Sequence, residues 1–418
     1  MKKLLGAVLC LSLVSAAFAN GDVSFDQRGS VSSIVSQLKA AAPEAAVVPL
    51  PGDSKAAKKW TVMVFVNAKN NLESFGLKDV NEMEMVGSDA NINIVAELGR
   101  IAGYSSAEGD WKGSRRYLVQ KDSNMNAIAS PVVMEIPKSD MGSWQYMVDF
   151  VTWARTNYPA QKYVLVIWNH GAGWNKIEPR LEDRGISYDD ETHNHITTPQ
   201  LRQALAAMGG VDILSMDACL MQMIEVAYEV KGLTEQIVAS EETEPGDGYT
   251  YDTFLGPLAK NPDMNSAQLA KVMVDAYTDH YVSINQGATQ SAINMAAMAG
   301  FPAVVNAFVD AMINNNDLAV AKAAKAKTQG FYYSSNKDMY HFAKLVYETT
   351  ANEEVKAAAQ RLATYLATEL ISYNRATGAK YANAYGLAAY MPTSYTSAYD
   401  GLLWAQDSKW DDFQKWLK

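Results

Sequence analysis

Two short segments carry the residue types that a thiol nucleophile and its proton carrier require. Val211 to Met221 is typical of a buried strand that stops at Asp217-Ala218-Cys219, and residues 162–168 are typical of another that ends in Asn169-His170-Gly171. Two neighbouring parallel strands would bring both side chains to one edge of a sheet, where open α/β sheets place their reacting groups. A cysteine and a histidine at such an edge suit acyl transfer, because a thiolate attacks the carbonyl and an imidazole carries the proton to the leaving amine.

This chemistry also needs hydrogen-bond donors for an oxyanion. The backbone N–H groups of Cys219 and Gly171 are the natural candidates, since glycine lets the main chain approach closely. A helix-compatible run, Met221 to Val230, follows the cysteine at once. We therefore expect N–H groups at a helix start to stabilise a thiolate at Cys219.

The chain has two cysteines, and Cys10 lies in an N-terminal leader. Cys219 would then be the only cysteine of the mature protein, so it could form no internal disulfide, and a free thiol in an oxidising compartment risks oxidation. A buried structural cysteine is the common alternative. The strand-end context and the matching histidine favour a chemical role.

The N-terminus predicts export. Lys2 and Lys3 precede an apolar run over residues 4–14, and Ala17-Phe18-Ala19 offers a cleavage site, so residues 1–19 are predicted to be a signal peptide. The apolar run is too short to span a membrane, and we expect no span elsewhere. The formal charge is −10, and loss of the two lysines would make it −12. This acidic balance argues against nucleic acid as a partner.

The chain divides into four predicted parts. After the leader, residues 20–59 are rich in Ala, Ser and Pro and are expected to be an N-terminal extension or a propeptide. Alternating strands and helices over 60–260 predict an α/β core with a mainly parallel sheet covered by helices. Residues 261–418 are predicted to be helix-rich and to contribute to the core or pack on it.

The elements expected around the site follow from apolar patterns and caps. Residues 172–195 are predicted to be a long polar loop, which is usually functional or mobile. Thr198 and Pro199 are expected in the N-cap and first-turn positions of the next helix. The other predicted elements are strands at 61–66, 92–98, 115–120, 132–136, 236–239, 289–294 and 385–390, and helices at 72–86, 144–157 (capped by Asp140 or Ser143), 266–282, 302–313, 337–348, 352–373 and 407–417.

Taken together, these segments resemble the clostripain family of cysteine peptidases, within the caspase-like clan. An apolar block ending in His-Gly, followed by one ending in Asp-Ala-Cys, carries the resemblance. Trp60 to Phe65 with Asn70 to Glu73, the run 169–174, and Ser240 to Gly248 agree with it. The resemblance covers roughly residues 60–255, and the C-terminal part matches only in outline. Lys69 departs from the pattern, since the family usually has an acidic residue there.

The resemblance implies a caspase-like α/β/α sandwich, with Cys219 as nucleophile and His170 as general acid/base. It implies that the two side chains are not in tight contact without substrate. It also implies an endopeptidase that cuts after Arg or Lys.

Two carboxylates support that specificity independently of the resemblance. Asp217 lies two residues before the cysteine, and Asp247 lies in a Gly/Pro turn at a strand end. Carboxylates at the mouth of a pocket would bind a basic side chain. The alternatives are that Asp217 caps a turn and that Asp247 is solvated. Glu242 and Glu244 are weaker candidates.

The resemblance also implies activation by self-cleavage in the loop 172–195. Lys176, Arg180 and Arg184 offer sites there. A cut before Trp60 is the alternative, and the basic residues for it are Lys55, Lys58 and Lys59.

Signals for metals are weak. His193 and His195 have the spacing of a metal pair, but in a polar loop an unliganded pair is the better interpretation. The family makes calcium a candidate ligand, although no EF-hand spacing is present. We predict no metal site and no cofactor requirement for the chemistry.

The prediction is a secreted cysteine endopeptidase, periplasmic or extracellular and monomeric, acting on protein or peptide substrates. The rival prediction is a non-catalytic exported binding or scaffold protein on the same fold. A weaker third is a hydrolase or transferase that uses the same pair on a non-peptide acyl group.

Overall fold

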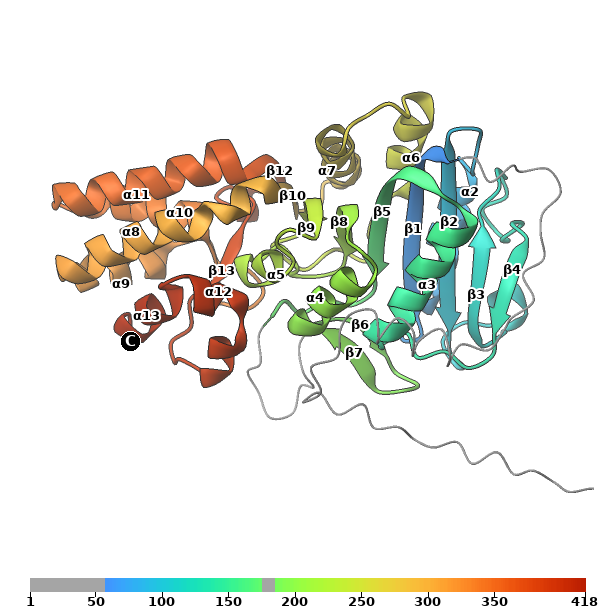
Figure 1. Ribbon diagram of the computed structural model, residues 1–418, viewed down its shortest axis with the longest axis horizontal. Helices are drawn as coiled ribbons and strands as arrows, with labels where there is room; N and C mark the ends of the chain where they lie inside the picture. Colours follow the sequence, from blue (N-terminus) through green and yellow to red (C-terminus); the bar gives the residue numbers. More distant parts are fainter. Residues whose placement is uncertain (1–56, 175–184) are drawn as a thin grey trace, which may run out of the picture.

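The computed structural model describes residues 57–174 and 185–418, and a nine-stranded sheet runs through it (Figure 1). The strand order is β12-β10-β9-β8-β5-β1-β2-β3-β4. The five central strands, β9 to β2, are parallel, and two antiparallel strands extend each edge. The strands are β1 (Lys58–Ala68), β2 (Ile92–Arg100), β3 (Gly113–Leu118), β4 (Val132–Ile136), β5 (Ala160–Trp168), β8 (Val211–Asp217), β9 (Thr234–Ala239), β10 (Ala288–Asn294) and β12 (Ile371–Thr377).

The central strands are apolar on both faces because helices cover both. In β1, Val62 and Val64 belong to one buried cluster, whereas Met63 and Phe65 belong to the other. Successive side chains of a strand point to opposite faces, so a continuous apolar run marks a strand that is buried twice. The buried-strand prediction for these runs is confirmed.

Two helical layers complete the sandwich. Helices α2 (Glu73–Glu84), α6 (Tyr251–Lys260) and α7 (Ser266–Ser283) cover one face. The opposite face carries α3 (Trp144–Asn157), α4 (Thr198–Ala207) and α5 (Ile224–Glu229). The predicted α/β class with a central, mainly parallel sheet is thereby confirmed.

The caps of two helices differ in how well the sequence predicted them. Ser143 caps α3 through its side chain, which accepts the N–H of Tyr146, as one of the two predicted alternatives. For α4 the prediction is wrong by one residue. Thr197, not Thr198, is the N-cap, because it forms a reciprocal capping box with Gln200.

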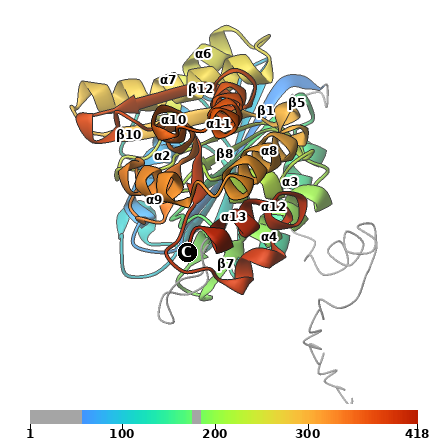
Figure 2. The ribbon, with the colours of Figure 1, turned by 90° about the vertical axis from the view of Figure 1, so that its left-hand side faces the viewer.

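The C-terminal part supplies both sheet strands and a separate helical layer. β10 and β12 extend the sheet beyond β9. Four helices gather beyond that edge, at the left of Figure 1 and towards the viewer in Figure 2. They are α8 (Phe301–Asn314), α9 (Leu318–Lys327), α10 (Met339–Thr349) and α11 (Glu353–Tyr365); the remaining elements are β11 (Asn336–Asp338), β13 (Ala388–Tyr390), α12 (Leu403–Asp407) and α13 (Trp410–Trp416).

One predicted helix is wrong at its end. The helix expected over 352–373 stops at Tyr365, continues as a π-helical turn over Leu366–Leu370, and gives way to β12 at Ile371. The apolar helical stripe runs as far as Leu370, so the local pattern gives no sign of the change. Antiparallel pairing of β12 with β10 determines the strand.

The predicted loop 172–195 is also wrong in its second half. A hairpin formed by β6 (Gly185–Asp189) and β7 (Asn194–Thr197) occupies residues 185–197. Lys176, Arg180 and Arg184 lie outside the described residues, as do the leader with Cys10 and the extension as far as residue 56. Within residues 57–174 and 185–418, no helix combines the length and hydropathy of a membrane span.

Candidate active site

The ends of β5 and β8, which precede His170 and Cys219, lie side by side. β5 and β8 are parallel neighbours, as predicted, and Trp168 pairs with Asp217 in their register. The N–H of Asn169 donates to the carbonyl of Asp217 at 3.2 Å and continues the pairing past the strand ends. His170 and Cys219 each follow their register partner by two residues, so both emerge at the same edge of the sheet.

His170 is held by the segments around it. Asn169, directly before it, is buried and donates to the carbonyls of Asn67 at 2.5 Å and Tyr188 at 3.2 Å. The Nε2 atom of His170 lies 2.7 Å from Oδ1 of Asn71. Burial lowers the pKa of His170, and the negative charge of Asp190 opposes that shift. A largely neutral imidazole can accept a proton.

Cys219 lies in a sharp turn rather than at a helix start. Leu220 has a left-handed backbone, with φ of 65°, and such a strained conformation persists only where the surroundings impose it. The N–H of Leu220 donates to the carbonyl of Glu242 at 3.0 Å, which ties the turn to the loop after β9. Helix α5 begins at Ile224 and has six residues. The expectation that a helix N-terminus stabilises the thiolate is therefore wrong.

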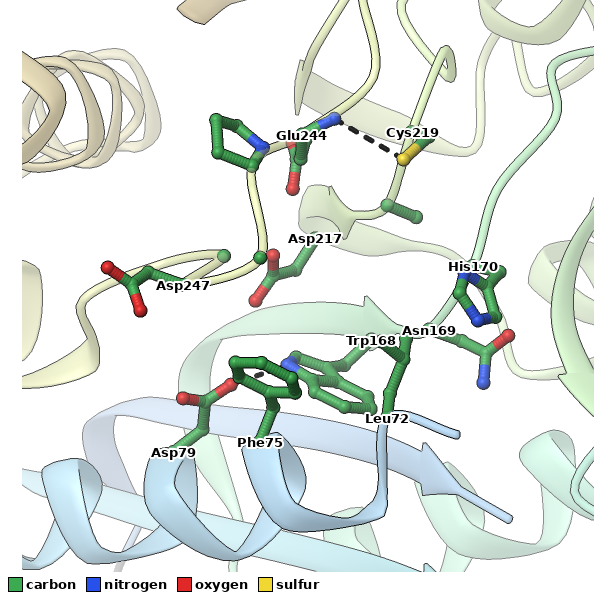
Figure 3. A pocket seen from close by; sticks show the side chains of 14 residues that line it. Leu72, Phe75, Asp79, Trp168, Asn169, His170, Asp217, Cys219, Glu244 and Asp247 are labelled. Carbon is green, nitrogen blue, oxygen red and sulfur yellow. Dashed lines mark hydrogen bonds between the residues drawn. The ribbon is translucent and has the colours of Figure 1, made fainter. Parts of the chain in front are cut away.

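Glu244 provides the donor that the helix does not. Its backbone N–H donates to Sγ of Cys219 at 3.3 Å. Figure 3 shows the sulfur turned towards Glu244, while the only hydrogen bond drawn to it comes from that residue and not from His170. Burial raises the pKa of the Cys219 thiol; the Glu244 N–H opposes the shift and the charge of Asp217 adds to it.

Gly171 allows the two strand ends to approach. A Cβ at this position would lie 2.5 Å from the carbonyl oxygen of Cys219 and 3.1 Å from its nitrogen. Any side chain would therefore push the turn that holds Cys219 away. The backbones of Gly171 and Cys219, the two predicted oxyanion donors, adjoin one another.

A cavity of about 190 Å³ opens beside the cysteine. Its apolar walls come from Leu72, Phe75 and Trp168, and both His170 and Cys219 line it. A slot of this kind can accept a long aliphatic side chain. The polar groups in its lining determine which charge or hydrogen-bonding group the end of that side chain must carry.

Three buried carboxyl groups line this cavity. Asp217 accepts the hydroxyl of Tyr251 at 2.9 Å and the N–H of Tyr249 at 3.2 Å. Asp79 accepts Nε1 of Trp168 at 2.6 Å through Oδ2, and its Oδ1 has no donor among the described residues. Both oxygens of Glu244 are buried and receive no N–H donor in the described part of the chain, and the Glu244 carboxyl shares a hydrogen bond with that of Asp217.

These carboxyl groups disfavour each other's ionisation. Burial raises the pKa of Asp217 to about 6. Burial and the neighbouring charge of Asp217 raise the pKa values of Asp79 and Glu244 well above the ordinary range. A cation that entered the cavity would stabilise the charged forms of these carboxyl groups, so the cavity favours a basic ligand.

The other sequence candidates lie differently. Asp247 is at the rim, where its half-exposed carboxylate lies 3.2 Å from Nε2 of His280 and 3.5 Å from Nζ of Lys78. Burial would raise the pKa of Asp247, but the hydrogen bond from His280 and the lysine outweigh it, and the pKa is lowered. Glu242 is outside the cavity, and its carboxylate lies 3.3 Å from Nζ of Lys380.

Sequence reasoning missed Asp79 and ranked Glu244 too low. Asp79 lies on α2 at helical spacing from Leu72 and Phe75 (i+3 and i+7), so it shares their face towards the cavity. A lone aspartate on the sheet-facing stripe of a helix was the signal that could have identified it. Glu244 could not be separated from its acidic neighbours without the path of the loop.

Metal-binding features are weak in the described residues. His195 stacks on Tyr188 with ring centroids 4.9 Å apart, and His193 has a left-handed φ of 56°. No group of three or more His, Cys, Asp or Glu side chains in residues 57–174 and 185–418 is placed to hold a metal ion. Lys69 is buried, with its Nζ 3.1 Å from Asp189 and 2.5 Å from Glu191. It joins the β6–β7 hairpin to the end of β1.

Comparison with known proteins adds the family. The model of the clostripain family matches residues 64–416. Clostripain from Hathewaya histolytica is 30% identical over an alignment of 231 residues, which covers 50% of this chain and 44% of that protein. The match thus spans less than half of that relative's length.

Solved structures share the fold. A secreted C11 cysteine protease from Bacteroides thetaiotaomicron, in complex with an irreversible peptide inhibitor, has a TM-score of 0.65 and 17% identity, covering 84% of this chain and 99% of its own. An inactive zymogen C11 protease from Parabacteroides distasonis has a TM-score of 0.62 and 20% identity, covering 84% and 98%. These likenesses confirm the predicted caspase-like α/β/α sandwich.

Proposed function

Because this chain belongs to the clostripain family of cysteine peptidases, we propose that it is an endopeptidase that cleaves peptide bonds after arginine or lysine. Cys219 is the nucleophile and His170 the general acid/base. The observation that carries the specificity is the cavity beside Cys219, which has apolar walls and three buried carboxyl groups. A basic side chain would place its stem along the walls and its charge among the carboxyls.

In the proposed mechanism, Cys219 gives its proton to His170 and the thiolate attacks the scissile carbonyl carbon. The N–H groups of Gly171 and Cys219 stabilise the oxyanion of the tetrahedral intermediate. The C–N bond then breaks, His170 protonates the leaving amine, and an acyl-enzyme thioester remains. His170 next deprotonates a water molecule, which hydrolyses the thioester and restores the thiol.

The substrate must bring the two catalytic side chains into line. The thiol is directed towards the N–H of Glu244, and His170 is directed towards Asn71. A peptide carbonyl placed between them would draw the sulfur out of its contact with Glu244. This supports a dyad that assembles only in the complex with substrate.

Export and self-activation belong to the same proposal. We propose a periplasmic or extracellular monomer with a peptidase core over 60–260, to which 261–418 contributes β10 and β12. Cleavage after a basic residue within 172–195 would activate it, and the zymogen state of the structural relative from Parabacteroides distasonis supports this. Intact mass of wild type and Cys219→Ala after incubation tests it; identical fragment patterns would contradict it.

The function is tested with two fluorogenic peptides, one ending in arginine and one in lysine before the reporter. Calcium and reductant are varied, and Cys219→Ala is the control. Activity that disappears in the variant supports the proposal. No cleavage of either peptide, even after limited trypsin treatment to mimic activation, would favour the non-catalytic binding protein on this fold.

A further inference from the structure

Glu244 connects the nucleophile directly to the cavity. Its backbone N–H donates to Sγ of Cys219 at 3.3 Å, while its carboxyl oxygens lie buried in the cavity wall. Asp217, two residues before the cysteine, contributes a second carboxyl to the same wall. Figure 3 shows both carboxyl groups on the side of the cavity next to the sulfur. A charge that enters the cavity therefore acts on the thiol across one residue.

The ionisable groups around the thiol and cavity come from four elements. Among the residues that line the cavity there is no lysine or arginine, and Lys78 is at the rim with Asp247. No lining cation therefore offsets the charge of Asp217, which disfavours a second negative charge on sulfur. The facing groups are His170 after β5, Asp217 at the end of β8, Asp79 on α2, and Glu242 and Glu244 in the loop after β9.

We propose that a guanidinium or ammonium group that enters this cavity converts Cys219 from thiol to thiolate, so that the nucleophile forms only when the cavity is filled. This inference rests on the proposed function, because it takes the cavity as the site of the substrate's basic residue. The cation offsets the carboxylate charge. With the free cation, the S–H proton passes to solvent and the Glu244 N–H still holds the sulfur. In the complex with substrate, the proton passes to His170 as the sulfur leaves Glu244. By linkage, ionisation of Cys219 strengthens cation binding by the same factor.

Such coupling would suit an exported enzyme with a free thiol. Oxidation and alkylation proceed through the thiolate. A cysteine that stays protonated until a basic side chain arrives is protected in an oxidising compartment. The basic residue of the substrate that the cavity recognises then also activates the nucleophile.

The test measures alkylation of Cys219 by iodoacetamide as a function of pH, with and without methylguanidinium, at constant ionic strength set by sodium chloride. Peptide mapping follows Cys219 alone. Saturating methylguanidinium should lower the midpoint by about one pH unit, so that alkylation below both midpoints is about ten-fold faster. A midpoint that is unchanged or raised would overturn the proposal.

A variant of Glu244 tests whether its carboxyl couples the bound cation to the Cys219 thiol. Glu244→Gln should reduce the cation-dependent shift at least two-fold, whereas Glu348→Gln, the same change on α10 outside the cavity, should match wild type. Equal cation-dependent shifts in the two variants would overturn the role of Glu244. If Glu244→Gln does not fold, the wild-type titration alone still tests the proposal. The assay needs no turnover. A normal shift without cleavage after basic residues contradicts only the proposed function, and cleavage without a shift contradicts only the coupling.

Discussion

The Oδ1 atom of Asn71 lies 2.7 Å from Nε2 of His170. An amide oxygen only accepts hydrogen bonds, so Nε2 carries the ring proton and Nδ1 is left to receive one. Asn71 lies in the loop between β1 and α2, whereas His170 follows β5. The tautomer of the proposed base is therefore determined by the strand next to its own.

Asn71 should act as a positioning residue for His170. Asn71→Ala should lower kcat/KM about ten-fold with little change in KM, because the imidazole loses its fixed orientation. Asn71→Asp should raise the pKa of His170 by its charge and move the acidic limb of the pH profile upwards. The measurement is kcat/KM against pH, with Asn126→Ala in an exposed loop as control. Superimposable profiles for all four proteins would contradict this role.

Gly171 should tolerate no side chain. Its Cβ would approach the carbonyl oxygen of Cys219 to 2.5 Å, so Gly171→Ala should reduce kcat/KM at least 100-fold by displacing the nucleophile turn. Gly256→Ala on α6 is the matched control, because its Cβ would meet its nearest neighbour only at 4.0 Å. Activities are compared on the arginine peptide. Full activity in Gly171→Ala would show that the strand ends are not held as closely as described.

The carboxyl groups inside the cavity should contribute more to binding of an arginine side chain than Asp247 at the rim. Asp79→Asn keeps an acceptor for Trp168 but removes a carboxyl that a bound guanidinium would ionise, so KM for an arginine peptide should rise about ten-fold. Asp247→Asn should change KM less than three-fold, because Asp247 is half exposed and already paired with His280 and Lys78. Steady-state kinetics on one peptide compares the two, and a reversed order would place the specificity at the rim.

Glu225 should make stability depend on pH. Burial raises its pKa to about 7, although Tyr399 and the N–H of Tyr390 donate to it. A raised carboxyl pKa adds stability below the unfolded value, and this stability is lost as pH rises through about 7. Glu225→Gln, with a similar shape and no charge, should therefore gain up to about 3 kcal/mol relative to wild type between pH 4.5 and 8.

Urea unfolding at several pH values measures this difference. The gain should appear mainly between about pH 5 and 7, and it should be small below pH 4.5. A constant difference between the two proteins at all pH values would mean that Glu225 does not titrate in that range.

The sequence predicted what local patterns determine. The apolar runs of β1, β5 and β8 are continuous, which is typical of strands buried on both faces, so their strand type and a mainly parallel sheet could be predicted. The expectation that His170 and Cys219 share one sheet edge followed from taking their two strands as parallel neighbours. Ser143 could be predicted because a cap and its helix adjoin in sequence.

Non-local contacts determined the rest. β12 follows a helical apolar stripe, and only its pairing with β10 makes it a strand. The donor to Cys219 comes from Glu244, which is 25 residues away, and not from the helix that follows. Asp79 enters the cavity because α2 packs on β1 and β2, next to the end of β5, where Trp168 donates to it.

In the proposed function, a positive charge before the scissile bond enters the carboxyl-lined cavity while Cys219 attacks. Two fluorogenic peptides that differ only in arginine or citrulline at that position separate charge from shape, since citrulline keeps the shape and lacks the charge. We predict that kcat/KM for the citrulline peptide is at least 100-fold lower, and that Cys219→Ala cleaves neither. Equal cleavage of both peptides, or cleavage that survives in Cys219→Ala, would contradict the account.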